Sequence, residues 1–160
     1  MSGQISHVTK PSHARRLVLD GFIPRPRGTA ATMPPVLSWP AKDPKDVLDY
    51  EFDVAPALVG NPEDGIADVN VTVSPANSGD LTVNNVAADG STVVLWFSSG
   101  QPGTTYVVNL LVTMTSGRIL QRSVMVPVVS LSNIAPPASA FVTDTGVLVT
   151  DQAGNPILSS

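Results

Sequence analysis

Two apolar segments separated by three residues constrain the fold of this chain more than any other feature. Residues 104–115 and 119–129 are rich in β-branched and other apolar side chains, which favour strands. Ser116, Gly117 and Arg118 lie between them, and glycine readily adopts the positive φ that a tight turn requires. The pattern predicts a long β-hairpin.

Four segments ahead of the hairpin predict further strands, at a spacing of about ten residues. Residues 46–54 alternate apolar and acidic side chains, with the period of two that a half-buried strand shows. Residues 67–74, 81–86 and 91–98 follow, separated by turn sequences rich in Gly, Asn and Asp. In the first segment we expect Leu48, Tyr50, Phe52 and Val54 to face a core, and Asp49, Glu51 and Asp53 to form a solvated face.

A tyrosine at the start of the hairpin indicates which class of β-sandwich the chain forms. Tyr106 follows a Gly-Gln-Pro-Gly turn at 100–103. In immunoglobulin-like sandwiches a tyrosine at this place forms the tyrosine corner, in which the hydroxyl bonds to upstream backbone. Six or so short strands without a convincing helix also favour a sandwich over a parallel sheet. We therefore predict an all-β, immunoglobulin-like β-sandwich over residues 41–129.

Residues 1–40 are predicted to form an extended N-terminal arm. Six prolines break any long helix or central strand in it, although residues 14–20 suit one short strand or helical turn. The arm carries too many apolar side chains for a disordered, solvated tail. We therefore expect it to pack in an ordered form against its own sandwich or against a neighbouring protein. The arm residues expected to contact a partner are Leu17, Leu19, Phe22, Ile23 and Trp39.

Residues 130–160 are predicted to form a linker and a short C-terminal β-meander. Residues 140–143, 147–150 and 156–158 have the composition of strands and are separated by turn sequences. A meander this small buries too little surface to be stable alone, which favours strand addition to a partner or oligomer formation. A frayed terminus is the alternative. The residues expected to make the contact are Phe141, Val147, Val149 and Ile157.

The net charge of -4 hides an uneven distribution. Seven of the nine basic residues lie at or before Lys45, whereas eleven of the 13 carboxylates follow it. A basic N-terminal segment of this kind can bind an acidic protein surface, nucleic acid or a membrane, or it can be a solvated tail. It has few residues to stack on bases, and no run reaches the ~18 apolar residues of a membrane helix. We expect protein partners, and neither nucleic acid nor membrane.

The sequence lacks the motifs of common catalytic and metal sites. It has no cysteine, and its two histidines, His7 and His13, lie in the arm without a nucleophile elbow or a carboxylate cluster. Glu63, Asp64 and Asp68 lack the spacing of an EF-hand, so a polar loop is favoured over a Ca²⁺ site. No apolar signal segment opens the chain, so we expect synthesis in the cytoplasm. We predict no enzyme, no cofactor, no metal and no small-molecule substrate.

Arg118 and Arg122 are the only basic residues after Lys45. We expect Arg122 on the outward face of the last sandwich strand, paired with the acids of residues 49–53 if those strands are neighbours. The alternative is an interface anchor, because arginine is enriched at interface hot spots.

Three pieces of the sequence together point to a family. They are Trp-Pro-Ala-Lys-Asp-Pro-Lys-Asp-Val-Leu-Asp-Tyr at 39–50, Gly-Gln-Pro-Gly-Thr-Thr-Tyr at 100–106 and Thr-Ser-Gly-Arg at 115–118. In this combination the chain resembles the tailed-bacteriophage fibre–tail adaptor proteins, which are small immunoglobulin-like virion proteins. The resemblance covers residues 39–129. It departs from the family at 54–56, where an aromatic residue is usual.

The resemblance implies a structural component of a phage virion, at the tail or the head–tail junction and in several copies. It would join tail fibres to the tail or connector through its arm and through strand addition. One alternative is a capsid decoration or cement protein. Another is a carbohydrate-binding module, for which Trp39, Trp96 and Tyr50 are the candidate aromatic platform.

Overall fold

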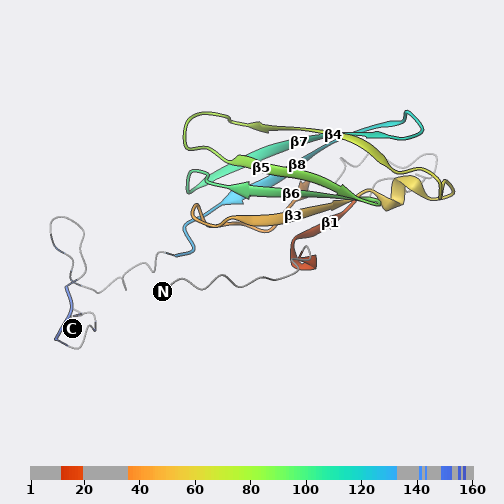
Figure 1. The fold of residues 1–160 in the computed structure, drawn as a ribbon. Coiled ribbons are helices and arrows are strands. Elements are labelled where there is room, and N and C mark those ends of the chain that lie inside the picture. Colours follow the sequence, from red (N-terminus) through yellow and green to blue (C-terminus); the bar gives the residue numbers. More distant parts are fainter. Residues whose placement is uncertain are drawn as a thin grey trace, which may run out of the picture. The chain divides into compact units, whose positions relative to one another are not determined.

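The computed structural model of the chain describes residues 12–19, 36–132, 141, 143, 149–152, 155 and 157. The chain divides into two units, Met1–Ser130 and Leu131–Ser160. The described part of the first is a sandwich of two four-stranded sheets, with the orders β1-β3-β6-β5 and β2-β8-β7-β4 (Figure 1). The predicted all-β sandwich is confirmed. Its strands are β1 (Arg16–Val18), β2 (Leu37–Ser38), β3 (Leu48–Asp53), β4 (Ile66–Ser74), β5 (Thr82–Asp89), β6 (Thr92–Ser98), β7 (Thr104–Met114) and β8 (Ile119–Val128). A 3-10 turn, η1 (His13–Arg15), precedes β1, and a second, η2 (Ala55–Leu58), follows β3.

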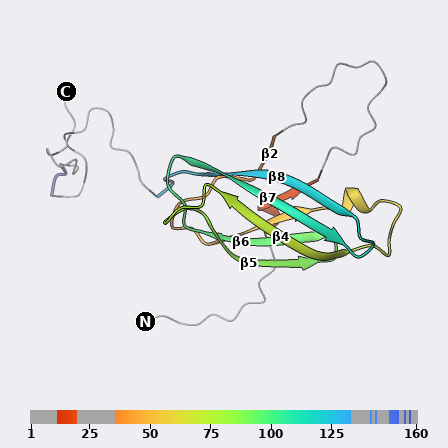
Figure 2. The same ribbon diagram turned by 90° about the horizontal axis from the view of Figure 1, so that it is seen from above.

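The predicted hairpin is the longest pairing in the sandwich. β7 and β8 pair antiparallel from Thr104 opposite Val128 to Thr113 opposite Ile119. Gly117 adopts a φ of 83° in the turn between them. Figure 2 looks onto β2, β8, β7 and β4, with strands of the other sheet beneath.

The tyrosine corner is formed as predicted. The hydroxyl of Tyr106, which is fully buried, accepts a hydrogen bond from the backbone N–H of Gln101 at 2.8 Å. It also donates to Oδ1 of Asp80 at 2.7 Å, a partner that the sequence did not indicate. Burial raises the pKa of Tyr106, so the hydroxyl keeps the proton that it donates. The corner therefore ties the start of β7 to the turn before β5.

The core lies between the sheets and follows the predicted alternation. Tyr50, Phe52 and Val54 are fully buried, as are the alternate residues at 93, 95 and 97 of β6. From the other sheet, β7 and β8 contribute the alternate residues at 106–112 and 124–128. The acids of β3 and the outward residues of β7 thus lie on the outer faces of the sandwich.

Short segments of the arm complete both sheets. β1 pairs parallel with β3, and β2 pairs parallel with β8. Residues 14–20 were predicted to form a strand or a helical turn, and the structure shows both, since η1 leads directly into β1. Lys42 is also fully buried, and its Nζ donates to the backbone oxygens of Asp43 and Ser99, each at 2.7 Å. The described parts of the arm therefore order on the chain's own sandwich.

Candidate interaction surfaces

Two of the three acids on the outer face of β3 are paired with arginines of the arm. Arg15 contacts Asp49 through its Nη2 at 2.6 Å, and Arg16 forms an ion pair with Asp53. The backbone N–H of Ser12 donates to the second oxygen of Asp49 at 2.7 Å. In this way η1 and β1 fix the arm along β3.

This pairing corrects two predictions. The three acids at 49, 51 and 53 were expected to form a solvated face, but their exposed fractions are 7%, 3% and 4%. Arg122 was expected to pair with them, but it lies on β8 in the other sheet, and Arg15 and Arg16 hold Asp49 and Asp53 instead. Alternation correctly identified the face, whereas the segment that covers it comes from more than 30 residues away.

The arm pairing is expected to make stability depend on pH. Burial alone would raise the pKa of Asp49, but the Ser12 N–H and Arg15 outweigh it and lower that pKa. Burial is likewise outweighed at Asp53 by Arg16, Ala55 N–H and Ser91, so its pKa is also lowered. A lowered carboxylate pKa stabilises the fold above the unfolded-state value of about 4, and this stabilisation is lost as the pH falls through the folded-state pKa.

We expect the Arg15→Gln/Arg16→Gln double variant to be less stable than the parent at pH 7. The two stability curves should converge as the pH falls below about 4, because protonated carboxyls give the parent no ion pairs. The measurement is the free energy of unfolding from pH 7 to pH 2. Lys45→Gln, which removes a charge from an exposed side chain, is the matched control. Parallel curves for the double variant and the parent would contradict the pairing.

The structure places the predicted contact residues in different environments. Leu19 and Trp39 are 1% and 2% exposed, so the prediction that they contact a partner is corrected: both belong to this chain's own core. Leu17 is half-buried against that core. In the second unit, Phe141 is 52% and Ile157 42% exposed, and Val149 is partly buried. Phe22, Ile23 and Val147 lie outside the described residues.

The aromatic platform of the alternative carbohydrate-binding hypothesis is mostly buried. Trp39 and Tyr50 are 2% and 0% exposed, and Trp96 is half-buried on the outer face of β6. A sugar-binding platform requires exposed ring faces, which two of the three candidates do not offer.

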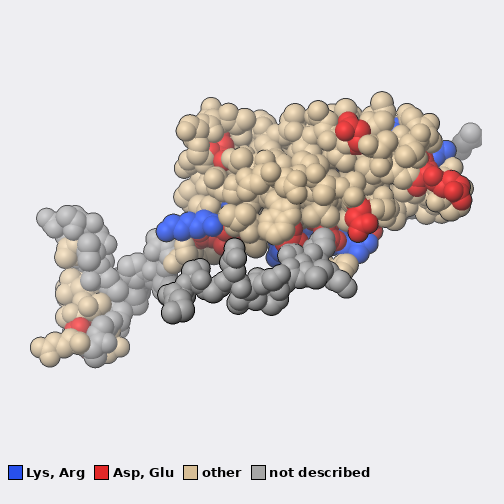
Figure 3. Space-filling view, viewed as in Figure 1, with Lys and Arg blue, Asp and Glu red and all other residues tan. Residues whose placement is uncertain are grey.

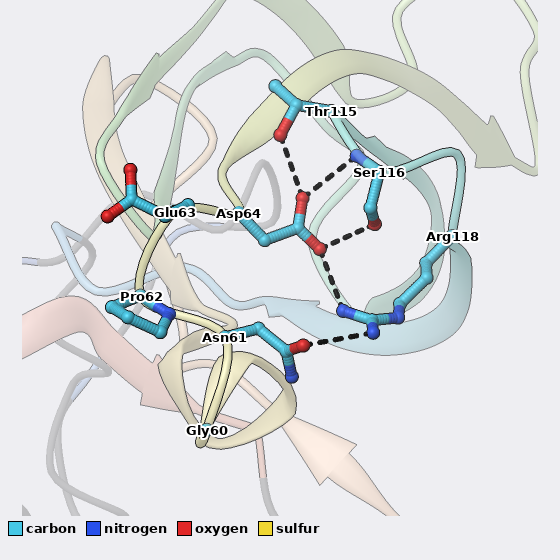
Figure 4. Close-up of a pocket in the computed structure, with 8 residues that line it drawn as sticks. All are labelled: Gly60, Asn61, Pro62, Glu63, Asp64, Thr115, Ser116 and Arg118. Carbon is cyan, nitrogen blue, oxygen red and sulfur yellow. Dashed lines mark hydrogen bonds and ion pairs between the residues drawn. The ribbon is translucent and has the colours of Figure 1, made fainter.

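A polar network joins two loops at one end of the sandwich (Figure 4). The carboxylate of Asp64 accepts hydrogen bonds from the hydroxyls of Thr115 and Ser116 at 2.8 and 2.6 Å, and from the Ser116 N–H at 3.0 Å. Arg118 donates from Nη1 to Asp64 and from Nη2 to Oδ1 of Asn61, both at 3.0 Å. The bonds from the Ser116 hydroxyl, which contributes most, from Thr115 and from the Ser116 and Gly65 N–H groups lower the pKa of Asp64. The network fastens the loop before β4 to the β7–β8 turn.

The same residues line an open cleft of about 460 Å³. Asp64 was considered as a calcium ligand, but its two oxygens accept the hydrogen bonds of Thr115, Ser116 and Arg118. No group of three or more His, Cys, Asp or Glu residues is arranged to hold a metal ion among the residues that the structure describes. The geometry therefore assigns Asp64 and Arg118 to fixing the loops, a role the sequence did not show because 54 positions separate them.

We expect Asp64→Ala to release this loop without unfolding the sandwich. The Ser116 amide, which donates to Asp64, should exchange its hydrogen at least about tenfold faster, since it loses that acceptor. The Gly65 amide should change less, because it also donates to the Thr115 hydroxyl. Hydrogen exchange read by NMR is the measurement. Glu63→Ala changes the adjacent, exposed carboxylate and should leave both amides unaffected. Unchanged protection in Asp64→Ala would show that the loops are held by other contacts.

The outward side of the β4–β7–β8 sheet carries almost no charge. Its side chains alternate with the buried core residues of the same strands and lie opposite one another in the strand register. Figure 3 shows charged side chains along β1 and β3 and at the end that holds η2, whereas the surface over β4 has few. The neutral face, as we call it, consists of Thr105, Val107, Asn109, Leu111 and Thr113 of β7, Ile119, Gln121, Ser123, Met125 and Pro127 of β8, and Asp68, Asn70, Thr72 and Ser74 of β4.

This face shares two features with protein interfaces, a scarcity of charge and an outward methionine. Charged residues are depleted in the centre of interfaces, and methionine is enriched there. Leu111 and Ile119 are 39% and 66% exposed on it, and Val107 and Met125 lie opposite each other. The sequence contained this signal as the uncharged alternate positions of the hairpin.

The comparisons with known proteins bear on the same region. A family model described as "Podophage GP4 fiber-tail adaptor protein gp77" matches residues 42–127. The chain belongs to this family. The match extends from Lys42, which bridges to the end of β8, to Pro127 within that strand. It therefore contains six complete or nearly complete strands of the sandwich, the Asp64 network and the neutral face, and confirms the resemblance found in the sequence.

The solution structure of the PKD domain from KIAA 1837 protein is similar at 17% identity, with a TM-score of 0.38, over 69% of this chain and 100% of that one. The comparison with curated proteins found no match. In the described part of the chain, no helix has both the length and the hydropathy to cross a bilayer.

Proposed function

We propose that this chain is a non-enzymatic structural protein that joins tail fibres to the tail or connector of a phage particle. The family match over residues 42–127 is the observation that carries the proposal. An adaptor must hold two different neighbours, and two separate surfaces suit that task. They are the neutral face of the first unit and the exposed apolar residues of the second.

The proposal gives the arm two roles. Its described segments brace the sandwich, since β1 and β2 complete the two sheets and Trp39 fills the core. Phe22 and Ile23 remain candidate contacts to a neighbouring virion protein, as does Val147 in the C-terminal extension. A protein partner with an uncharged surface fits the neutral face best, because a desolvated charge opposite it would lack a counter-ion.

Localisation in the particle is the direct test. An epitope tag on the chain, located by gold labelling in electron micrographs of purified particles, is expected at the tail or head–tail junction. Labelling over the capsid shell would instead identify a decoration protein. Absence of the tag from particles would overturn the proposal.

The neutral face can be tested in the same particles. Leu111→Lys places a charge at its centre and is expected to lower incorporation of the chain or of its neighbour about tenfold, the effect of ~1.4 kcal/mol of binding free energy. Val59→Lys, at an 81% exposed position outside the neutral face, is the control. Thermal unfolding of both purified variants shows that they fold. Equal incorporation of the two would exclude the neutral face as the contact.

A further inference from the structure

The strand β5, Thr82–Asp89, is an edge strand whose outer side is open among the strands that the structure describes. It ends the order β1-β3-β6-β5 and pairs only with β6 in that part of the chain (Figure 2). Residues 84–89 are all exposed. An open edge presents unpaired N–H and C=O groups, which can template the addition of another strand. This edge belongs to the sheet opposite the neutral face, so it is a separate surface.

The side chains of β5 leave apolar surface that a neighbouring strand would cover. Val86 and Ala88 lie directly opposite Leu95 and Val93 of β6, which are fully buried, so all four are on the inner side of the sheet. Val86 is nevertheless 37% exposed. The inner residues of the other long edge strand, β4, at positions 69, 71 and 73, are half-buried against the core. The remaining edge strands, β1 and β2, have three and two residues, and such short edges resist strand addition. Among the four, β5 is therefore the edge best suited to accept a strand.

The hydrogen-bond pattern around β6 identifies the backbone groups that point to the open side. The oxygen of Ser91, just before β6, accepts from the Val54 N–H, so the backbone groups of residues 91, 93, 95 and 97 point toward β3. Those of residues 92, 94 and 96 therefore point toward β5, where they pair with residues 89, 87 and 85. The N–H and C=O groups of Val86 and Ala88 lie between these positions, so they point away from β6 and into the open edge.

We propose that two copies of the chain pair antiparallel through their β5 strands, about a twofold axis at Ala87. Val86 then exchanges both backbone hydrogen bonds with Ala88 of the second copy, and Ala88 does so with Val86 of the second copy. Ala87 faces itself across the axis, and Asn85 faces Asp89. This register uses only residues 85–89, which lie beyond the irregularity in the β5–β6 pairing that precedes Asn85. A twofold pairing of identical edges is a closed, self-complementary contact.

The side chains of β5 match one another in this register. Asp89 is the only charged residue of the strand, and it faces the Asn85 amide of the second copy, which can donate to its carboxylate. Ala87 suits the axis, because opposite residues of a non-hydrogen-bonded pair bring their Cα atoms to ~4.5 Å. On the inner side, Val86 packs against Ala88 of the second copy and loses part of its exposure. A second copy of this chain is therefore an occupant that matches the edge in length, charge and shape.

The paired surface is small, so the dimer should be weak and should depend on concentration. Specific, stable interfaces bury about 1,200–2,000 Å² of surface, more than five residues per strand supply. In sedimentation equilibrium, the mass of the parent should rise from 16.6 kDa toward about 33 kDa, twice that value, as the concentration is raised.

Single cysteines test the register, because the chain has none of its own. Ala87→Cys brings two sulfurs to the axis, where Cα atoms ~4.5 Å apart are within the ~4.4–6.8 Å that a disulfide spans. It should oxidise to covalent dimers about tenfold faster than Asn85→Cys, because only its thiols are held close together. Asn85 is exposed on the same side of the same strand, but two such residues lie four positions apart along the paired strands, ~14 Å at ~3.4 Å per residue.

Two lysine variants test the charge pattern of the proposed pairing. Ala87→Lys places like charges face to face at the axis and should leave the chain monomeric. Asn85→Lys adds the same charge two positions away, where it faces Asp89 of the second copy, and should retain or strengthen the dimer. Both positions are exposed, and thermal unfolding should show that both variants fold.

Three results would overturn the proposal. One is a parent that stays monomeric at all concentrations while Ala87→Cys fails to cross-link. Another is equal cross-linking of Ala87→Cys and Asn85→Cys, which would mean random collision or a different register. The third is a dimer that persists in Ala87→Lys, which would mean that another surface forms it. All these measurements use the purified chain, so their outcome is independent of whether the chain attaches fibres.

Discussion

Replacing Trp39 by alanine is expected to lower the free energy of unfolding by about 3–5 kcal/mol. The indole is 2% exposed and meets the rings of Tyr50 and Phe97 edge-on, with centroids 5.7 and 5.8 Å apart. Its Nε1 also donates to the backbone oxygen of Glu51 at 2.9 Å. The substitution therefore leaves a cavity and removes the indole donor from the carbonyl of a buried residue. Thermal or denaturant unfolding should show a midpoint lower by about 10 °C or more.

The control for Trp39 lies three positions away. Val36 is 73% exposed, and Val36→Ala should change stability by less than about 0.5 kcal/mol. If Trp39 instead bound a partner or a glycan, Trp39→Ala would retain the stability of the parent and lose only binding. That result would contradict the core position, and with it the inclusion of this part of the arm in the sandwich.

Most of the sandwich could be predicted because its signals are local. Alternation with period two marked β3, β4 and β6, and glycines at turns separated them. The hairpin strands were predicted at 104–115 and 119–129, and the structure has Thr104–Met114 and Ile119–Val128. These patterns record which side of a strand is apolar and where the chain can reverse, and both are properties of neighbouring residues.

The contacts of the arm were not predictable in the same way. Alternation in β3 gives the same pattern whether its acids face water or the arginines of another segment. The two cases differ by a contact such as that of Arg15 with Asp49, which lies 34 positions further along the chain. The strands β1 and β2 are three and two residues long, too short to show a period.

The basic character of the arm has a different explanation from the one its sequence indicated. Arg15 and Arg16 pair with the chain's own acids, and Lys42 is buried with two backbone oxygens. Three of the seven basic residues at or before Lys45 are therefore engaged within the first unit. These three charges therefore do not indicate an external acidic partner, whereas the neutral face of the opposite sheet remains a candidate contact.

Replacing Gly100 by alanine is expected to destabilise the protein by about 3–5 kcal/mol. Its φ of 108° lies where L-residues rarely occur, and such a backbone conformation costs about 1–3 kcal/mol. An added Cβ would also stand 2.8 Å from Cγ2 of Val128 and 3.4 Å from Cε2 of Tyr106. Both neighbours are fully buried, so neither can move without disturbing the tyrosine corner, and overpacking adds about 1–3 kcal/mol.

Gly103 provides the matched control within the same turn. Its φ is 82°, but no heavy atom lies within 4 Å of the position that a Cβ would take. Gly103→Ala should therefore cost about 1–2 kcal/mol, from the backbone alone. The difference between the two variants, measured by denaturant unfolding, reports the contact of residue 100 with Val128 and Tyr106 together with the difference in backbone cost between a φ of 108° and one of 82°. Equal losses would mean that the core beside the corner accommodates a methyl group. The corner would then owe its geometry to the hydrogen bonds of Tyr106 with Gln101 and Asp80, and not to close packing against Gly100.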